Sequence, residues 1–223
     1  MATEEQRGER RTDALSKKRI VEAAIDILDS DGESALTFRA LATHLATGSG
    51  ALYWHVANKS ELLTAATDAV IAHALAAVGD NDDPRTAIRT ITSGVFDAIH
   101  AHPWVGTQLS RELMQTASMQ ILESIGTRLD QFGVPDDKQF DCATAIMSYI
   151  LGLAAQYAAG ARLVAGETNR TAYLASAADR WRSLDADEYP FVRRIAEQLP
   201  QHDDRTQFQA GIDLILVGIS ATV

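Results

Sequence analysis

Apolar side chains recur at helical spacing along most of this chain. Between residues 16 and 30 they fall at Ile20, Ala23, Ala24, Ile27 and Leu28, which is the pattern of one buried helix face. Similar patterns, bounded by Gly, Pro or capping residues, predict further helices. They cover residues 37–45, 49–55, 58–78, 84–101, 103–114, 118–132, 136–164, 190–199 and 205–220. No strand-type alternation occurs, so the pattern predicts an all-α chain, with the polar stretch 166–182 unassigned.

The segment from residue 36 to residue 63 has the most informative pattern. Leu41 and Leu45 share a helix face, and residues 46–50 (ATGSG) then break the helix and form a turn. Farther along, Asn58 and Glu61 have the spacing of a helix cap and its reciprocal partner. Two short helices around a tight turn, followed by a long helix, predict a helix-turn-helix whose second helix enters the major groove of DNA.

This segment resembles the DNA-binding domain of the TetR family of bacterial transcriptional repressors. The resemblance rests on Leu36, Thr37, Leu41, Ala42, Leu45, Leu52, Tyr53, Trp54, His55, Val56, Asn58, Lys59, Leu62 and Leu63. It implies a homodimer that binds a palindromic operator in double-stranded DNA and is released by a small-molecule effector. It also implies three parts: a flexible arm (1–14), a DNA-binding domain (15–62) whose last helix begins at residue 58, and a helical effector-binding and dimerisation domain (63–223).

Nine residues are expected to face DNA. Arg39 suits a bidentate contact with guanine, or else it is a surface arginine paired with a carboxylate. Tyr53 is expected to place its hydroxyl on a phosphate, and Lys59 adds charge at a helix start that already favours phosphate. The indole of Trp54 packs either against the domain core or against the DNA backbone. The full set is Thr37, Arg39, Ser49, Gly50, Ala51, Tyr53, Trp54, His55 and Lys59.

The charge distribution is compatible with DNA binding in spite of a net charge of -10. Residues 1–60 hold 8 Lys/Arg and 9 Asp/Glu, whereas residues 61–223 hold 12 and 21. The acidic excess therefore lies away from the expected DNA surface. The arginines of the arm, at positions 7, 10 and 11, either touch DNA or belong to a solvated tail.

The C-terminal half offers candidates for an effector pocket. The run His102-Pro103-Trp104 resembles the tetracycline-repressor subclass of C-terminal domain, which implies an unidentified small apolar or amphipathic effector. Aromatic and methionine side chains with an occasional polar group suit such a ligand, although each also fits an ordinary core. The candidates are His100, Trp104, Met114, Tyr149, Gln156, Tyr157 and Trp181. His100 and His102, two residues apart, do not share a helix face and lack a third ligand, so no metal site is predicted.

Small residues on two predicted helices mark an expected dimer interface. Gly152, Ala155 and Ala159 lie on nearly one face of the helix at 136–164. Gly211 and Gly218, seven residues apart, lie with Ile215 on the last helix. The resemblance implies that these two helices pair with their copies as a four-helix interface.

Other features restrict the class of protein. The single cysteine, Cys142, excludes an internal disulfide and fits a reducing cytoplasm. No apolar run reaches the roughly 18–20 residues that span a bilayer, and the first residues lack the apolar stretch of a secretory signal. No phosphate-binding loop, nucleophile elbow or zinc spacing is present, so neither an enzyme nor a cofactor is predicted. Two alternatives remain: an effector-independent DNA-binding dimer with a filled core, and a helical enzyme or small-molecule binder that has lost DNA binding.

Overall fold

The computed structural model describes residues 15–79, 83–111, 115–163 and 167–223, and side chains over the same ranges except 157–169. Within these ranges it contains helices and no strand, which confirms the all-α prediction. The helices are α2 (Lys17–Asp31), α3 (Phe38–His44), α4 (Ser49–Leu52), α5 (Lys59–Leu75), α6 (Pro84–Ala101), α7 (Pro103–Arg111), α8 (Thr116–Gln131), α9 (Asp136–Leu163), α10 (Glu167–Arg182), α11 (Pro190–Ile195), the 3₁₀-helix η1 (Ala196–Gln201) and α12 (Asp204–Ser220).

Most predicted helix ends agree with the structure to within three residues, and capping side chains explain several starts. Ser16 accepts a hydrogen bond from the backbone N–H of Arg19, and Asp83 accepts one from that of Thr86. Three predictions differ. The helix expected at 190–199 divides into α11 (Pro190–Ile195) and the 3₁₀-helix η1 (Ala196–Gln201). The helix expected at 49–55 is shorter, because α4 ends at Leu52 and residues 53–55 form a turn. The unassigned stretch 166–182 is helical as α10 from residue 167.

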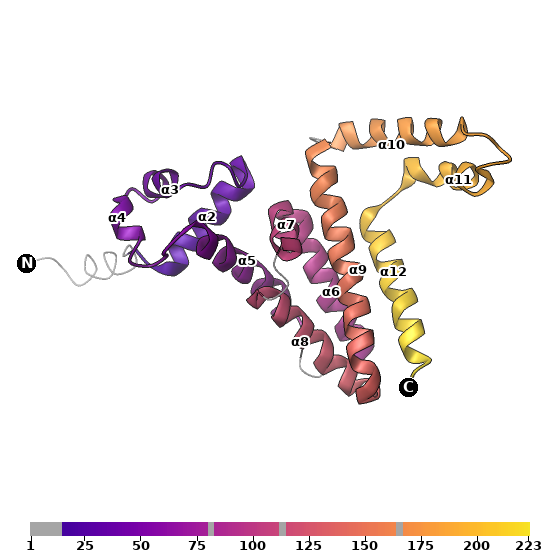
Figure 1. Cartoon of the computed structure of the whole chain (residues 1–223), viewed down its shortest axis with the longest axis horizontal. Helices are drawn as coiled ribbons and strands as arrows, with labels where there is room; N and C mark the ends of the chain where they lie inside the picture. Colours follow the sequence, from indigo (N-terminus) through magenta and orange to yellow (C-terminus); the bar gives the residue numbers. More distant parts are fainter. Residues whose placement is uncertain (1–14, 80–82, 112–114, 164–166) are drawn as a thin grey trace, which may run out of the picture.

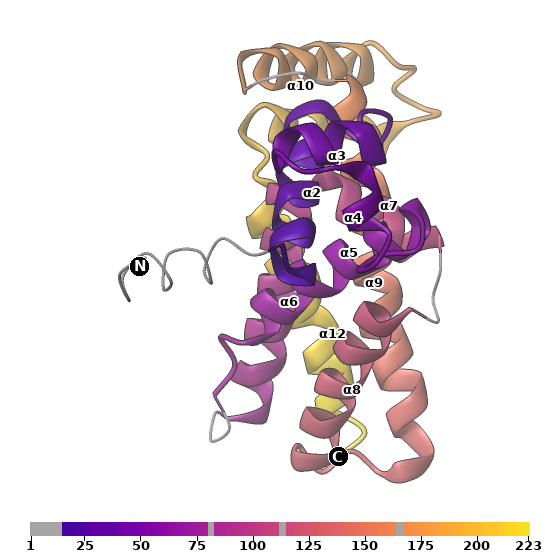
Figure 2. The same cartoon turned by 90° about the vertical axis from the view of Figure 1, so that its left-hand side faces the viewer.

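The helices form two groups joined by α5 (Figure 1). We name α2, α3 and α4 the N-terminal helical unit, and α6, α7, α8, α9 and α12 the C-terminal bundle. Helix α5 begins against α2 and continues into the bundle, where it packs on α6 and α8. Helix α10 extends sideways from the end of α9 past α12 and packs on η1 and α11 (Figure 1), while α8, α9 and α12 run along the bundle (Figure 2). Within the described residues, no helix is both long and apolar enough to cross a membrane.

Close approaches between backbones hold the bundle together. A Cβ at Gly94 of α6 would lie 2.8 Å from the carbonyl oxygen of Ala74 in α5. A Cβ at Gly106 of α7 would lie 3.0 Å from the carbonyl oxygen of Ala154 in α9. Both helix pairs therefore depend on the absence of a side chain at the glycine. The position of α7 relative to α9 is consequently well determined.

The turn between α3 and α4 is built differently from the prediction. Its left-handed residue is Ala46, with φ 49°, whereas Gly48 has φ −84°. The N–H of Thr47 donates to the carbonyl of Ala42 (2.9 Å), and the N–H of Ala46 donates to that of Thr43 (3.2 Å). This is the hydrogen-bond pattern of a Schellman motif, which usually has glycine at the left-handed position. The two glycines of the cluster therefore do not supply the positive φ.

We expect the substitution Ala46→Gly to stabilise the protein. A left-handed residue with a Cβ costs about 1–2 kcal/mol, and the greater chain entropy of glycine offsets about half of that gain, so about 0.5–1 kcal/mol should remain. Urea unfolding measures the difference. The matched control Ala72→Gly, on the exposed side of α5, should lose about 1 kcal/mol. An Ala46→Gly variant no more stable than the parent chain would contradict this account of the turn.

Candidate nucleic-acid interface

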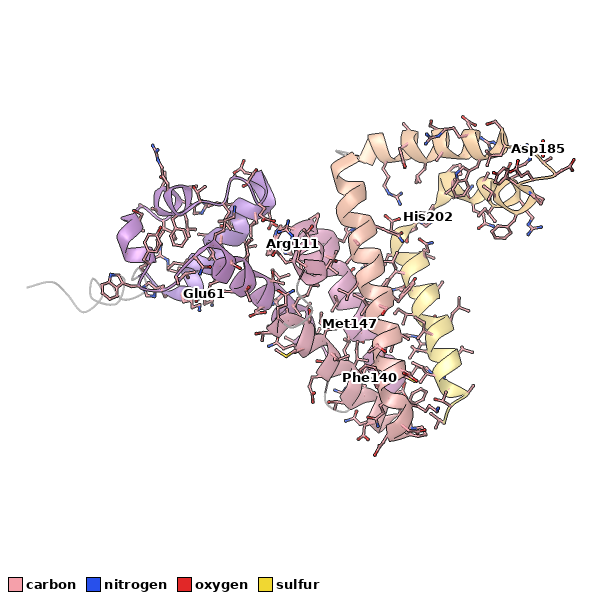
Figure 3. All side chains as sticks on the ribbon, in the orientation of Figure 1. Glu61, Arg111, Phe140, Met147, Asp185 and His202 are labelled. Carbon is pink, nitrogen blue, oxygen red and sulfur yellow. The ribbon has the colours of Figure 1, made fainter. Side chains whose placement is uncertain are left out.

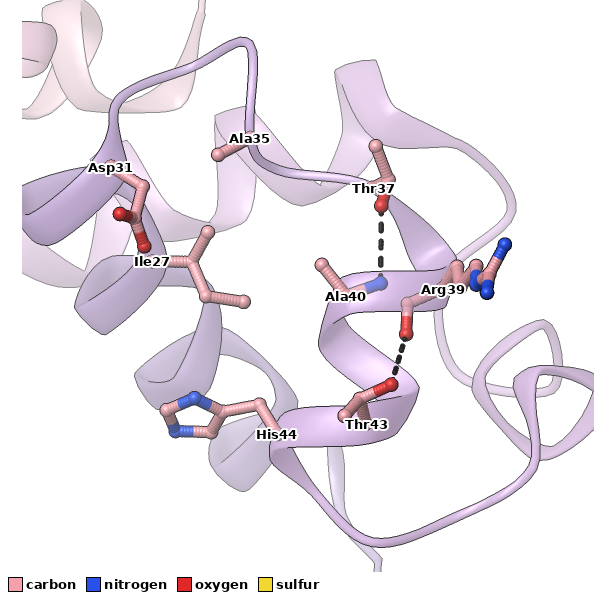
Figure 4. Close-up of a pocket in the computed structure, with 8 residues that line it drawn as sticks. All are labelled: Ile27, Asp31, Ala35, Thr37, Arg39, Ala40, Thr43 and His44. Carbon is pink, nitrogen blue, oxygen red and sulfur yellow. Dashed lines mark hydrogen bonds between the residues drawn. The ribbon is translucent and has the colours of Figure 1, made fainter.

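The exposed surface of α3 centres on Arg39. Thr37 caps the helix by accepting a hydrogen bond from the N–H of Ala40 (3.1 Å), and the Thr43 hydroxyl donates to the carbonyl of Arg39 (3.0 Å) (Figure 4). The guanidinium of Arg39 points away from the hollow of about 480 Å³ between α2 and α3 (Figure 4). Arg39 forms no ion pair with any residue that the structure describes. Its guanidinium is therefore available to an external partner.

Helix α4 presents its first turn to solvent. Ser49 and Gly50 are exposed and Ala51 is half-buried, while Leu52 and Val56 are buried in the hydrophobic core, and α4 packs on α3. The start of α4 therefore offers small side chains at the surface. Such an end can approach a base pair closely.

Two large aromatic side chains follow α4. Tyr53 stacks on Phe38, with ring centroids 4.4 Å apart and an interplanar angle of 2°, and yet it is 57% exposed. Its ring is therefore held in place while its hydroxyl faces solvent. Trp54 is 89% exposed, so of its two predicted positions the packing against the domain core does not occur, and the contact with the DNA backbone stays a prediction. His55 is half-buried beside them.

The first turn of α5 is stabilised by a small network. Asn58 accepts a hydrogen bond from the N–H of Glu61 (2.9 Å), as predicted for the cap. Glu61 accepts one from the N–H of Ala57 (2.9 Å) and one from the ammonium of Lys17 (3.1 Å) (Figure 3). The hydrogen bond from Ala57, followed by that from Lys17, holds the pKa of Glu61 below its usual value. Lys17 thereby ties the start of α2 to α5.

Lys59 takes part in a contact that its sequence position does not reveal. Its ammonium donates to the backbone carbonyl of Glu33, in the connection between α2 and α3. The side chain is half-buried, so a contact with phosphate requires this hydrogen bond to be exchanged. Lys59 therefore helps to hold α2, α3 and α5 together in the free protein.

The candidates for an effector pocket do not converge on one site. Trp104 is buried, but its indole N–H donates to Asp29 of α2 (2.7 Å). Tyr149 stacks on Phe208 with centroids 5.6 Å apart and joins α9 to α12, and burial raises the pKa of Tyr149. Gln156, predicted inside an apolar run, is exposed.

The remaining pocket candidates lie apart from these. His100 is exposed on α6, and Trp181 is half-buried in α10, which packs mainly on η1 and α11. Met114 and the side chain of Tyr157 lie outside the described residues. These positions therefore stay predictions without a shared cavity.

Sequence reasoning missed two buried polar residues at the start of α8. Gln115 and Ser118 are 6% and 2% exposed, and the Nε2 of Gln115 and the Oγ of Ser118 have no hydrogen-bond partner within the described part of the chain. The sequence predicted a helix that starts at Ser118, whereas α8 begins at Thr116 and Ser118 is buried in its first turn. Buried polar groups are normally paired, so this site needs an explanation.

The residues expected at a dimer interface separate into two groups. Gly152, Ala155 and Gly218 are exposed. In contrast, a Cβ at Gly211 would lie 2.0 Å from the hydroxyl of Tyr149, and Ile215 packs against the chain's own core. Gly211 and Ile215 therefore serve the contact between α9 and α12 within one chain. The side chain of Ala159 lies outside the described residues.

Two further residues extend the exposed face of α12. Leu214 and Val217 are 74% and 63% exposed. They lie one turn apart and next to Gly218. On α9, Ser148 is exposed one turn before Gly152 and Ala145 two turns before it. We name Leu214, Val217, Gly218, Ala145, Ser148, Gly152 and Ala155 the α9–α12 face. Its helical spacing was present in the sequence, but the exposure of the two large residues was not evident.

Comparison with known proteins gives matches over both halves of the chain. Residues 20–66 match the family model described as "Bacterial regulatory proteins, tetR family". Residues 79–223 match the model described as "Tetracyclin repressor-like, C-terminal domain". Among curated proteins, the HTH-type transcriptional repressor DrrR1 of Streptomyces coeruleorubidus is 29% identical over 222 residues, which cover 94% of this chain and 78% of that protein.

Solved structures extend the comparison to three dimensions. The transcriptional regulator SCO7222, a TetR from Streptomyces coelicolor, is 47% identical, with a TM-score of 0.84 over 94% of this chain and 99% of that chain. ActR from the same organism, solved in complex with actinorhodin, is 24% identical, with a TM-score of 0.77 over 93% of this chain and 96% of that chain. The ActR likeness concerns the fold alone.

Proposed function

Since this chain belongs to the TetR family of DNA-binding transcriptional regulators, we propose that it is a homodimeric repressor controlled by a small molecule. In this proposal, the N-terminal helical unit binds one half of a palindromic operator. Helix α5 links it to the remaining residues, which bind the effector and form the dimer. The exposed surface of α3 and α4, with Arg39 at its centre, is the observation that carries the proposal.

The α3–α4 surface combines base recognition with phosphate contacts. Arg39 has a free guanidinium that can donate two hydrogen bonds to a guanine, and Ala51 suits the methyl group of a thymine. Tyr53 keeps its hydroxyl outward on a ring that is already held by Phe38, so little side-chain entropy is lost on binding a phosphate. The exposed indole of Trp54 lies beside it and can pack against the DNA backbone.

We expect Arg39→Ala to weaken binding to the operator by about 5- to 150-fold, which corresponds to a lost base contact of about 1–3 kcal/mol. Fluorescence anisotropy on a duplex selected from a random pool measures the affinity. The control Arg180→Ala removes an exposed arginine of α10, at the far end of the molecule (Figure 1), and should leave the affinity unchanged. Equal affinities for Arg39→Ala and the parent chain would contradict the role of Arg39.

The α9–α12 face supports the homodimer. Leu214 and Val217 are large apolar side chains that water would otherwise surround, and such patches commonly mark an interface. The small residues of α9 allow a second helix to approach closely. A two-fold axis beside this face would bring two copies of α9 and α12 together as four helices. The dimer would then place two α3–α4 surfaces on one operator.

We expect Leu214→Asp to convert the dimer into a monomer, because the new carboxylate would lie opposite its own copy or another apolar residue. Sedimentation velocity measures the mass, and operator affinity should fall at least about 100-fold as two-site binding is lost. The control Met119→Asp places the same charge on an exposed apolar position of α8. A Leu214→Asp variant that folds and remains dimeric would rule out this interface.

The start of α8 supports an effector site within the C-terminal bundle. Helix α8 packs on α5, α6 and α9, and Gln115 and Ser118 at its start are buried. A buried donor without a partner costs about 1–3 kcal/mol, and a ligand oxygen would remove that cost. The chemistry favours a mainly apolar small molecule with a carbonyl or hydroxyl oxygen. A regulator without an effector remains the alternative, with a filled core.

A thermal-shift screen with aromatic ketones, phenols and medium-chain alcohols tests this site. We expect at least one compound to raise the melting temperature and to bind Gln115→Leu at least about 10-fold more weakly, because the amide donor is lost. The control Gln120→Leu changes an exposed glutamine of the same helix and should bind like the parent chain. Absence of any stabilising compound would favour the effector-independent alternative.

A further inference from the structure

We propose that two carboxylates, Asp29 of α2 and Glu33 just after it, couple the N-terminal helical unit to α7 and so carry the effector response to the DNA surface. We name Asp29, Glu33, His102, Trp104, Gln108 and Arg111 the carboxylate clasp. The proposal rests on the proposed function for its biological meaning. Its physical content is that a displacement of α7 is transmitted to α2.

The first half of the clasp is centred on Asp29. The indole N–H of Trp104 donates to its Oδ1 (2.7 Å). The Nδ1 of His102 lies 2.8 Å and 2.9 Å from the two carboxylate oxygens. Trp104 is buried and the Asp29 side chain is 34% exposed, so this hydrogen bond is partly shielded from competing water. The end of α2 is thereby attached to the first turn of α7.

The second half is centred on Glu33. The guanidinium of Arg111 donates to both carboxylate oxygens (3.1 Å and 3.0 Å), and the amide of Gln108 donates to one of them (3.1 Å) (Figure 3). The backbone carbonyl of Glu33 accepts the hydrogen bond from Lys59 of α5. Glu33 therefore connects α7, α5 and the N-terminal helical unit at one point.

One face of α7 contacts α2, and another face packs in the C-terminal bundle. Trp104, Gln108 and Arg111, at positions i, i+4 and i+7, face α2. Val105 and Leu109 are fully buried in the bundle, and Gly106 lies against the backbone of Ala154 in α9. Because interiors are closely packed, α7 moves with the bundle. A shift of the bundle around α7 would therefore displace Asp29 and Glu33.

A groove beside the carboxylate clasp leaves α2 with few other attachments to the rest of the chain. A groove of about 1020 Å³ lies between α2, α5 and α6, and its walls include Val21, Ile25, Ala69, Ala98 and Ala101. Along this groove α2 is separated from α6. The N-terminal helical unit is thus held to the rest of the chain mainly by α5 and by the clasp. Since α7 ends four residues before Gln115, a molecule bound there would act next to the clasp.

Reversing the charges of the ion pair between Glu33 and Arg111 tests the proposal. Glu33→Arg and Arg111→Glu each place like charges together, whereas the double variant restores an opposite pair, and Gln108 can then present its amide oxygen. Hydrogen exchange of the full chain is the measurement. We expect the amides of α2 and α3 to exchange about 10-fold faster in each single variant and within about twofold of the parent rate in the double variant. Amides of α8 and α9 should not change.

A matched pair elsewhere provides the control. Arg89 and Asp213 form an ion pair of similar exposure between α6 and α12 (2.6 Å). Arg89→Glu or Asp213→Arg should leave exchange in α2 and α3 unchanged. The proposal is overturned if the single clasp variants do not alter α2 and α3, if all helices accelerate equally, or if the double variant does not recover.

Operator binding provides a second readout. Coupling between sites is reciprocal, so a bound duplex should slow exchange in α7 of the parent chain and not in the single clasp variants. A parent chain that binds the selected duplex without any change in α7 would also overturn the proposal. If the parent chain binds no duplex, the proposed function fails, while exchange in the free protein still decides whether the clasp couples the two groups.

Discussion

The first turn of α5 is the constraint on which the arrangement of the molecule depends. Asn58 and Glu61 cap it, Lys17 ties it to α2, and Lys59 ties it to the connection before α3. The rest of α5 packs on α6 and α8, so one helix belongs to both groups. Because a helix is stiff over this length, the orientation of the α3–α4 surface follows the direction of α5. The carboxylate clasp adds a second attachment, and two attachments define an orientation better than one.

The proposed recognition of DNA rests on local geometry rather than on net charge. The N-terminal 60 residues are almost neutral, and Lys17 and Lys18 are paired with Glu61 and Glu22. Among the described residues, the proposed DNA surface offers Arg39, which has no ion-pair partner there, the stacked ring of Tyr53 and the exposed indole of Trp54. A surface with few free cations binds non-specific DNA weakly, because few counterions are released. Under the proposed function, selectivity would come from base contacts and from the simultaneous engagement of two half-sites.

Helix positions were predictable because periodicity and caps are local, as Ser16, Thr37 and Asn58 show. Long-range features were not. Ala46 takes the left-handed position beside two glycines because the Schellman hydrogen bonds depend on where α3 ends. A side chain at Gly211 would collide with Tyr149 of another helix. The indole of Trp104 donates its hydrogen bond to Asp29, which is 75 residues away. The inward turn of Ser118 follows from a shift of two residues in the start of α8, which periodicity does not resolve.

The contrast between two tryptophans gives the molecule internal optical probes. Trp54 is almost fully in water beside α4, whereas Trp104 is buried and hydrogen-bonded to a carboxylate. An indole in water emits at longer wavelength than one in an apolar interior, and a nearby carboxylate alters its quantum yield. A change around α4 and a change at the contact between α2 and α7 therefore alter different parts of one emission spectrum. The order in which these two changes occur can be measured from the intrinsic fluorescence, without an attached dye.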